Sequence, residues 1–145
     1  MLDRPSQLKV EDSGISAGIY APTIRYNSYN DTFYMITTQF SGGMGNMIVK
    51  TKDPMKGWSD PIKLNFEGID PDIFFDDNGK AYVTHNDAPE KPLYEGHRVI
   101  KVWEYDLEKD QIIPGKDKVV VNGGVDLSKK PIWIEAPHLY KKDGK

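Results

Sequence analysis

The sequence predicts an all-β protein that forms part of a β-propeller, and three observations support this prediction. Short runs of β-branched and aromatic residues follow one another along the 145 residues, separated by turns rich in Gly, Asn, Asp and Pro. No segment has the 3.6-residue periodicity of an amphipathic helix. A proline opens three of the runs, at Pro22, Pro71 and Pro137, and the spacings of 49 and 66 residues are typical of propeller blades.

The first cycle of strands is expected over residues 18–67. Residues 1–17 are polar and predict a lead-in segment with at most one short strand. The alternation of apolar and polar residues then predicts four strands, with the first two forming a hairpin and a glycine-rich loop before the third. These strands are expected over residues 19–26, 32–38, 46–50 and 62–64.

The second cycle is expected over residues 68–133, and a third begins at residue 134. Strands of the second cycle are predicted over residues 72–75, 80–85, 98–105 and 118–121. Residues 134–140 have the pattern of one further strand, so the start of the next blade is expected over 134–145. Two blades and one strand cannot close a ring, so we expect a larger propeller or other chains that supply the missing blades.

Composition excludes several classes of partner. The 19 basic and 22 acidic residues give a net charge of −3 without a basic cluster, which argues against nucleic acid. No run of about 18 apolar residues predicts a membrane span. The absence of cysteine excludes disulfides and favours a reducing, cytoplasmic location. The three histidines show no metal-ligand spacing, so no metal site is predicted.

Two acids near the strand openings carry the functional prediction. Asp70 and Glu135 lie just before Pro71 and Pro137, and corresponding positions of repeated blades fall on one face. Two converging carboxyl groups are the minimum needed to hydrolyse a glycosidic bond. The simpler alternatives are that Asp70 starts a turn and that Glu135 is an ordinary polar residue at a strand entrance.

Other conspicuous residues have structural interpretations. The spacing of one acidic group does not match a calcium-binding loop, so its members are interpreted as turn residues: Asp72, Asp76, Asp77 and Asn78. The three tryptophans sit in or beside strands and turns, and we expect them to pack between strands: Trp58, Trp103 and Trp133.

Three segments resemble glycoside hydrolase family 43, the β-xylosidases and α-L-arabinofuranosidases built on a five-bladed β-propeller. They are Gly-Ile-Tyr-Ala-Pro-Thr-Ile-Arg-Tyr at residues 18–26, Gly-Ile-Asp-Pro-Asp-Ile-Phe-Phe-Asp-Asp-Asn-Gly at 68–79 and Ile-Glu-Ala-Pro-His-Leu-Tyr-Lys at 134–141. Motifs in the family's order and spacing extend over essentially the whole chain.

The resemblance implies site residues. Asp70 matches the aspartate that orients the general acid and adjusts its pKa, and Glu135 matches the proton donor. Tyr20 and Ile69 match positions that face the substrate, and the alternative for Tyr20 is a place in the core. The family often holds a central calcium, but its ligands are not expected in this chain, so no cofactor is predicted within it.

The resemblance implies an inverting glycosidase that acts on xylosides or arabinosides of plant cell-wall hemicellulose. The blade with the general base would precede Met1, so we expect the isolated chain to be inactive. The alternatives are a non-catalytic carbohydrate-binding or assembly fragment and a propeller used only for protein contacts. The expected partners are a carbohydrate and, to cover the open blade edges, a second copy or a complementing chain.

Overall fold

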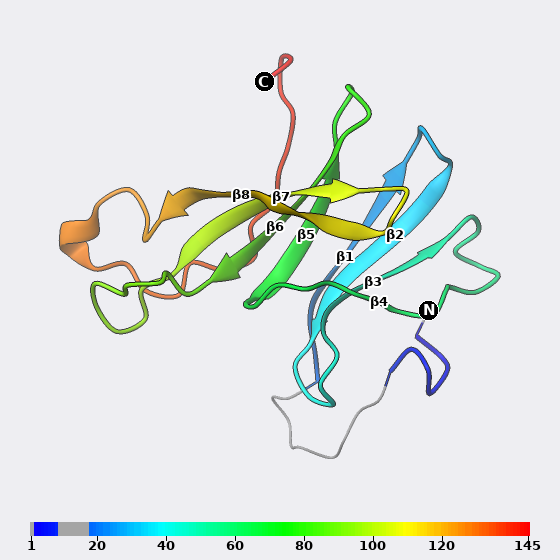
Figure 1. Ribbon diagram of the computed structural model, residues 1–145, viewed down its shortest axis with the longest axis horizontal. Coiled ribbons are helices and arrows are strands. Elements are labelled where there is room, and N and C mark those ends of the chain that lie inside the picture. The colour runs from blue at the N-terminus through cyan, green and yellow to red at the C-terminus, as the bar shows by residue number, and fades with distance from the viewer. Residues whose placement is uncertain (1, 9–17) are drawn as a thin grey trace.

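Two four-stranded antiparallel sheets form the fold in the computed structural model, which describes residues 2–8 and 18–145 (Figure 1). The sheets have strand orders β1-β2-β3-β4 and β5-β6-β7-β8, so each is a meander like a propeller blade. The first sheet contains β1 (Ile19–Asn27), β2 (Thr32–Gln39), β3 (Gly45–Thr51) and β4 (Ile62–Lys63). The second contains β5 (Ile69–Phe75), β6 (Ala81–Asp87), β7 (Val99–Asp106) and β8 (Gln111–Asn122), and the 3-10 helix η1 (Leu127–Lys129) follows it.

The eight expected strands of the two cycles are present, with changes at their ends. β5 begins at Ile69, three residues before its predicted start. β8 is much longer than predicted, because its pairing with β7 continues across two register shifts. The expected strand over residues 134–140 is not formed, since no described strand pairs with that segment. The possible short strand near residue 8 falls largely outside the described residues.

The main hydrophobic core lies between the two sheets. Alternation along β2 directs Tyr34 and Ile36 into this core, whereas Met35 belongs to a smaller cluster with Val49 and Trp58. The buried members of the main cluster come from both blades: Tyr34, Ile36, Ile48, Leu64, Ile73, Ala81, Val83, Tyr105 and Ile112. Because each blade buries its apolar face against the other, the core fixes their relative position.

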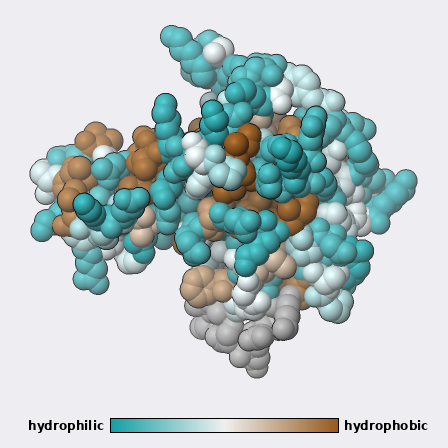
Figure 2. All heavy atoms as spheres, viewed as in Figure 1, coloured by the Kyte–Doolittle hydropathy of each residue, from teal (hydrophilic) through white to brown (hydrophobic). Residues whose placement is uncertain are grey.

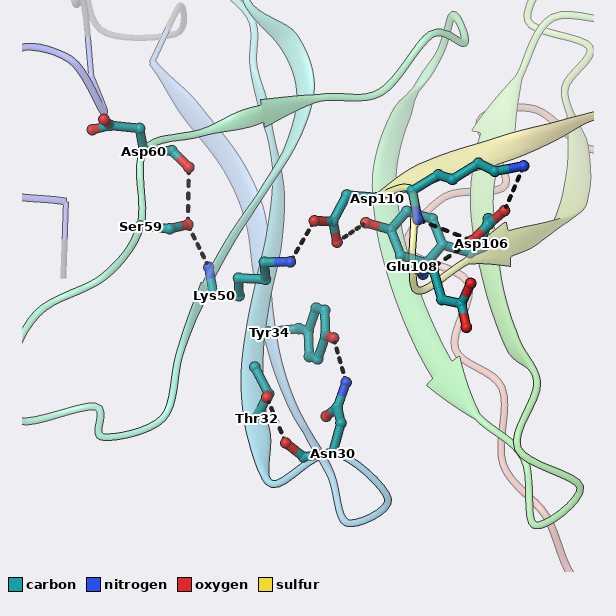
Figure 3. Close-up of polar contacts among 11 residues, drawn as sticks. Asn30, Thr32, Tyr34, Lys50, Ser59, Asp60, Asp106, Glu108 and Asp110 are labelled. Atoms are coloured by element: carbon teal, nitrogen blue, oxygen red, sulfur yellow. Dashed lines mark hydrogen bonds and ion pairs between the residues drawn. The ribbon is translucent and has the colours of Figure 1, made fainter.

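An ion pair also connects the blades beside this core (Figure 3). Lys50 of β3 pairs with Asp110, which precedes β8, and the Tyr105 hydroxyl donates to the same carboxylate at 3.3 Å. Burial and the neighbouring Asp110 raise the pKa of Tyr105, so its hydroxyl stays a hydrogen-bond donor. On the first blade, the Asn30 side-chain amide donates to the Tyr34 hydroxyl at 2.9 Å.

His85 of β6 is completely buried and neutral. Its Nε2 accepts a hydrogen bond from Trp103 Nε1 at 2.9 Å, which leaves the proton on Nδ1, 3.1 Å from the Asn86 carbonyl oxygen. Desolvation lowers the pKa of His85 from 6.5 to about 4.

Two of the three tryptophans, Trp103 and Trp58, pack against the hydrophobic clusters between strands, as predicted. Within the described residues, no helix is long and apolar enough to cross a membrane.

The buried His85 predicts a loss of stability in mild acid. The unfolded chain takes up a proton near pH 6.5, whereas the folded chain resists protonation down to about pH 4. Stability is therefore complete above pH 6.5 and falls as the pH drops toward 4, by up to about 1.4 kcal/mol per pH unit. Urea unfolding at pH 7, 6 and 5 measures this slope. His85→Gln should be less stable at pH 7 but show a flatter slope, and equal slopes would contradict the assignment.

Candidate active site

The same backbone distortion opens three successive segments of the chain. The residue before each proline has a positive φ: 38° at Ala21, 55° at Asp70 and 49° at Ala136. In β1 and β5 the pairing register shifts across this dipeptide, between Tyr20 and Thr23 and between Ile69 and Asp72. A proline cannot donate to the sheet ladder, so the openings of β1 and β5 are bulges that redirect the neighbouring side chains.

This register corrects the predicted equivalence of the two acids. Asp70 immediately precedes Pro71 and corresponds to Ala21 and Ala136. Glu135 lies one residue earlier, so it corresponds to Ile69 and Tyr20. The acids are therefore not related by the repeat. What connects them is a direct contact between Asp70 and the backbone of the segment that carries Glu135.

Asp70 touches the peptide group that follows Glu135. Its Oδ2 accepts a hydrogen bond at 3.2 Å from the Ala136 backbone N–H, which belongs to the Glu135–Ala136 peptide. Asp70 is 9% exposed, whereas the side chain of Glu135 is exposed to solvent. A buried acid thus holds the backbone of an accessible one.

Two side chains of β6 hold the same segment at other points. The Asn86 side-chain amide donates to the Ile134 carbonyl oxygen, and the Thr84 hydroxyl donates to the Pro137 carbonyl oxygen at 3.2 Å. Both residues are buried. The backbone on each side of Glu135 is therefore fixed by side chains of the second blade, in a segment without a strand ladder of its own.

Asp72 connects both blades with the segment after Glu135. Arg25 of β1 donates to its two oxygens, at 3.0 Å from Nε and 2.8 Å from Nη2, and His138 Nδ1 lies 3.1 Å from Oδ2. The hydrogen bond with Asp72 raises the pKa of Arg25. Asp72 is 1% exposed, so the prediction of a turn residue is wrong for Asp72. The following turn at residues 76–79 forms as expected, with the Gly79 N–H donating to the Asp76 carbonyl oxygen at 3.0 Å.

Tyr20 and Ile69, the two predicted substrate-facing residues, lie at the openings of β1 and β5. Both are partly buried, and the Tyr20 ring stacks on Phe40 with 5.1 Å between centroids. Beside Ile69, the Gly68 carbonyl oxygen accepts a 3.1 Å hydrogen bond from the Asn46 side chain. A Cβ on Gly68 would lie 1.9 Å from the Asn86 carbonyl oxygen, so only glycine fits there.

The positioning residues Asn86, Thr84 and Arg25 were missed in the sequence, and Asp72 was misassigned. Their function depends on contacts across 47 to 53 sequence positions, which no local pattern reveals. The one available signal was that Asp72 lies two residues after Asp70, because alternate residues of a strand share a face.

Residues 2–8 and 18–145 contain no group of three or more His, Asp or Glu side chains arranged to hold a metal ion. No chemical step is assigned to the calcium that the resemblance implies.

Comparisons with known proteins show which family the sequence matches. The family model for Glycosyl hydrolases family 43 matches residues 1–145. A xylosidase/arabinosidase of Butyrivibrio fibrisolvens is 47% identical over 148 residues, which cover 99% of this chain and 27% of that protein.

Two solved structures are also similar. The crystal structure of a GH43_12 protein retrieved from a capybara gut metagenome has a TM-score of 0.95 at 72% identity, covering 99% of this chain and 27% of that one. The xylan β-1,4-xylosidase of Bacillus halodurans C-125 has a TM-score of 0.77 at 31% identity, covering 97% and 27%. The chain thus spans about a quarter of the length of the relatives it matches.

Removing the Asn86 amide should loosen the Glu135 segment without unfolding the sheets. A lost buried hydrogen bond costs about 1–2 kcal/mol, so Asn86→Ala should speed exchange of the Ala136 amide proton by about tenfold. Asn46→Ala is the matched control, because Asn46 holds Gly68 in the preceding repeat. NMR hydrogen exchange measures both variants. Unchanged Ala136 exchange in Asn86→Ala, or equal acceleration in the control, would contradict the positioning role.

Proposed function

The chain belongs to glycosyl hydrolase family 43, and from this membership we propose that it supplies the proton-donor side of an inverting glycosidase site. Glu135 is the general acid that protonates the departing oxygen, and Asp70 is the auxiliary acid that orients it. The main support is the hydrogen bond from the Ala136 N–H to Asp70, which attaches the buried acid to the backbone of the accessible one.

The arrangement suits proton donation to a large substrate. A general acid must come within hydrogen-bond reach of the glycosidic oxygen, and the exposed Glu135 side chain is accessible to a sugar from solvent. Its main chain is held by Asn86 and Asp70 on either side, so the side chain extends from a backbone of fixed course. Such positioning reduces the entropy that is lost when substrate and acid come together.

Inversion also requires a carboxylate base, about 6.5–9.5 Å from the acid, to activate water. The two positions before the proline of each opening hold no third acid. They are occupied by Tyr20 and Ala21, by Ile69 and Asp70, and by Glu135 and Ala136. We propose that the base is not among the described residues. The 145-residue chain alone is then expected to bind sugar without efficient turnover.

The proposed substrates are xylosides or arabinosides of plant cell-wall hemicellulose. The matched Butyrivibrio protein is named a xylosidase/arabinosidase, which supports this class. Tyr20 lies at a strand opening and presents an aromatic ring, a surface suited to the apolar face of a sugar. Sugar binding without hydrolysis by every form of the protein would instead favour a carbohydrate-binding fragment.

We also propose that the isolated chain associates with a second copy through the outer part of the second blade. Val119, Val120 and Val121 of β8 are 51%, 52% and 40% exposed. Beside Val120 lies a groove of about 410 Å³ that is lined in part by Phe74, Tyr82 and Val102. Exposed apolar surface of this kind favours association.

Replacing Glu135 should affect poor leaving groups most. In the longest natural polypeptide that contains these residues, Glu135→Gln should lower kcat on xylobiose by about 10²–10⁴-fold, because the departing sugar oxygen needs a proton. The loss should be much smaller on 2,4-dinitrophenyl xyloside, whose leaving group departs without one. Asp70→Asn is measured beside it. The asparagine oxygen can still accept the hydrogen bond from the Ala136 N–H, so this variant removes only the negative charge of Asp70. Equal losses on both substrates for Glu135→Gln would refute the general-acid role.

Self-association should depend on the apolar surface of β8. Sedimentation velocity of the 145-residue chain should show a mass that rises with concentration, and Val120→Lys should shift the chain toward monomer. Lys56→Ala, at an exposed position of the first blade, is the control and should leave the mass unchanged. A monomer at all concentrations would rule out the proposed association.

A further inference from the structure

The sequence predicted that Trp133 packs between strands. This prediction is wrong, because Trp133 is 50% exposed. Its φ is 55°, in the left-handed region that bulky residues seldom occupy. Such strain costs about 1–3 kcal/mol and persists where the surrounding structure enforces it, commonly at ligand sites. An exposed indole in a strained conformation therefore calls for a functional explanation.

The neighbouring loop holds Trp133 firmly in this position. The Trp133 N–H donates to the Gly96 carbonyl oxygen at 3.1 Å, and the guanidinium carbon of Arg98 lies 4.4 Å from the ring centroid. Gly96 has a φ of 78°, and a Cβ there would lie 2.9 Å from the Ile132 side chain. The backbone and one cation thus place the ring, while half of the residue stays accessible.

Trp133 is also close to the proposed proton donor. It precedes Glu135 by two residues, so the two Cα atoms are at most about 7 Å apart. Asn86 fixes the intervening Ile134 carbonyl, which gives this short stretch a defined course. The surrounding lobe contains η1 and is seen at the left of Figure 1, where Figure 2 shows hydrophobic side chains at the surface. Exposed apolar residues in the loop before β7 and around η1 include Leu93, Val125 and Ile132.

We propose that Trp133 is a stacking surface for a second sugar ring, on the leaving-group side of the bond that Glu135 protonates. This inference rests on the proposed function. The C–H groups on one face of a pyranose pack on an indole, and Arg98 keeps the ring in place. Because the ring precedes Glu135 by two residues, a sugar stacked on it occupies the position next to the cleaved unit. Trp133 then favours substrates of at least two sugar units over single sugars.

Calorimetric binding of xylose and xylobiose to the 145-residue chain tests the proposal. Trp133→Ala should weaken xylobiose binding by about fivefold to tenfold and leave xylose binding unchanged. Trp133→Phe keeps an aromatic face and should restore most of the affinity. Leu93→Ala is the matched control, because it removes another exposed apolar side chain, 67% accessible, from the same lobe. Urea unfolding verifies that each variant is folded.

Each outcome separates this inference from the proposed function. Unchanged xylobiose affinity in Trp133→Ala overturns the stacking role, while the leaving-group test of Glu135 still decides the hydrolase proposal. Equal weakening by Leu93→Ala also overturns it and indicates a general apolar surface, such as a protein contact. If no form of the chain binds xylobiose, the inference fails, and the rates of the Glu135 variant remain an independent measure of function.

Discussion

A proline that cannot donate a hydrogen bond, preceded by a residue at positive φ, is the constraint on which the candidate site depends. The three openings share this geometry at Ala21, Asp70 and Ala136, although only one of these residues is acidic. Left-handed backbone costs roughly 1–2 kcal/mol for a residue with a side chain, so the surrounding contacts must compensate. At Asp70 the compensation includes a hydrogen bond to the following segment, and the distortion that interrupts the strand thereby aims the acid.

The segment that carries Glu135 and the sheets that support it have different sources of stability. The sheets are held by continuous ladders and by a core shared between the blades. Residues 131–142 have no ladder and are held by a few side chains, chiefly Asn86, Thr84, Asp70 and Asp72. Local opening of such a segment costs less than global unfolding. This segment is therefore expected to open locally before the sheets unfold.

The strands and the candidate acids were predictable because they depend on local patterns. Alternation in β2 and the turn at residues 76–79 identified their hairpins, and the motifs around Asp70 and Glu135 singled out both acids. The relation between these acids was misjudged, although the sequence itself places Asp70 one residue before its proline and Glu135 two residues before its own. The segment after residue 133 has a strand-like sequence, but a strand also needs a neighbour to pair with.

Trp133 and Asp72 show the two opposite failures of reasoning from residue type. A tryptophan beside an apolar run suggests packing, yet its exposure is set by the loop that contains Gly96 and by Arg98. An aspartate near other acids suggests a solvated turn, yet Asp72 is buried because Arg25, 47 positions earlier, compensates its charge. Both outcomes depend on tertiary partners, which a single sequence does not identify.

The Asp72 carboxylate also limits how far these blades can be treated as interchangeable modules. Arg25 from the first blade and His138 from the third segment meet on one buried acid of the second. Removing the first blade would take Arg25 away and leave the buried Asp72 carboxylate without its cation, at a cost of about 3–5 kcal/mol. The backbone geometry thus repeats from blade to blade, whereas the charge pairing joins different blades. A chimera that exchanges the first blade must keep a cation opposite Asp72.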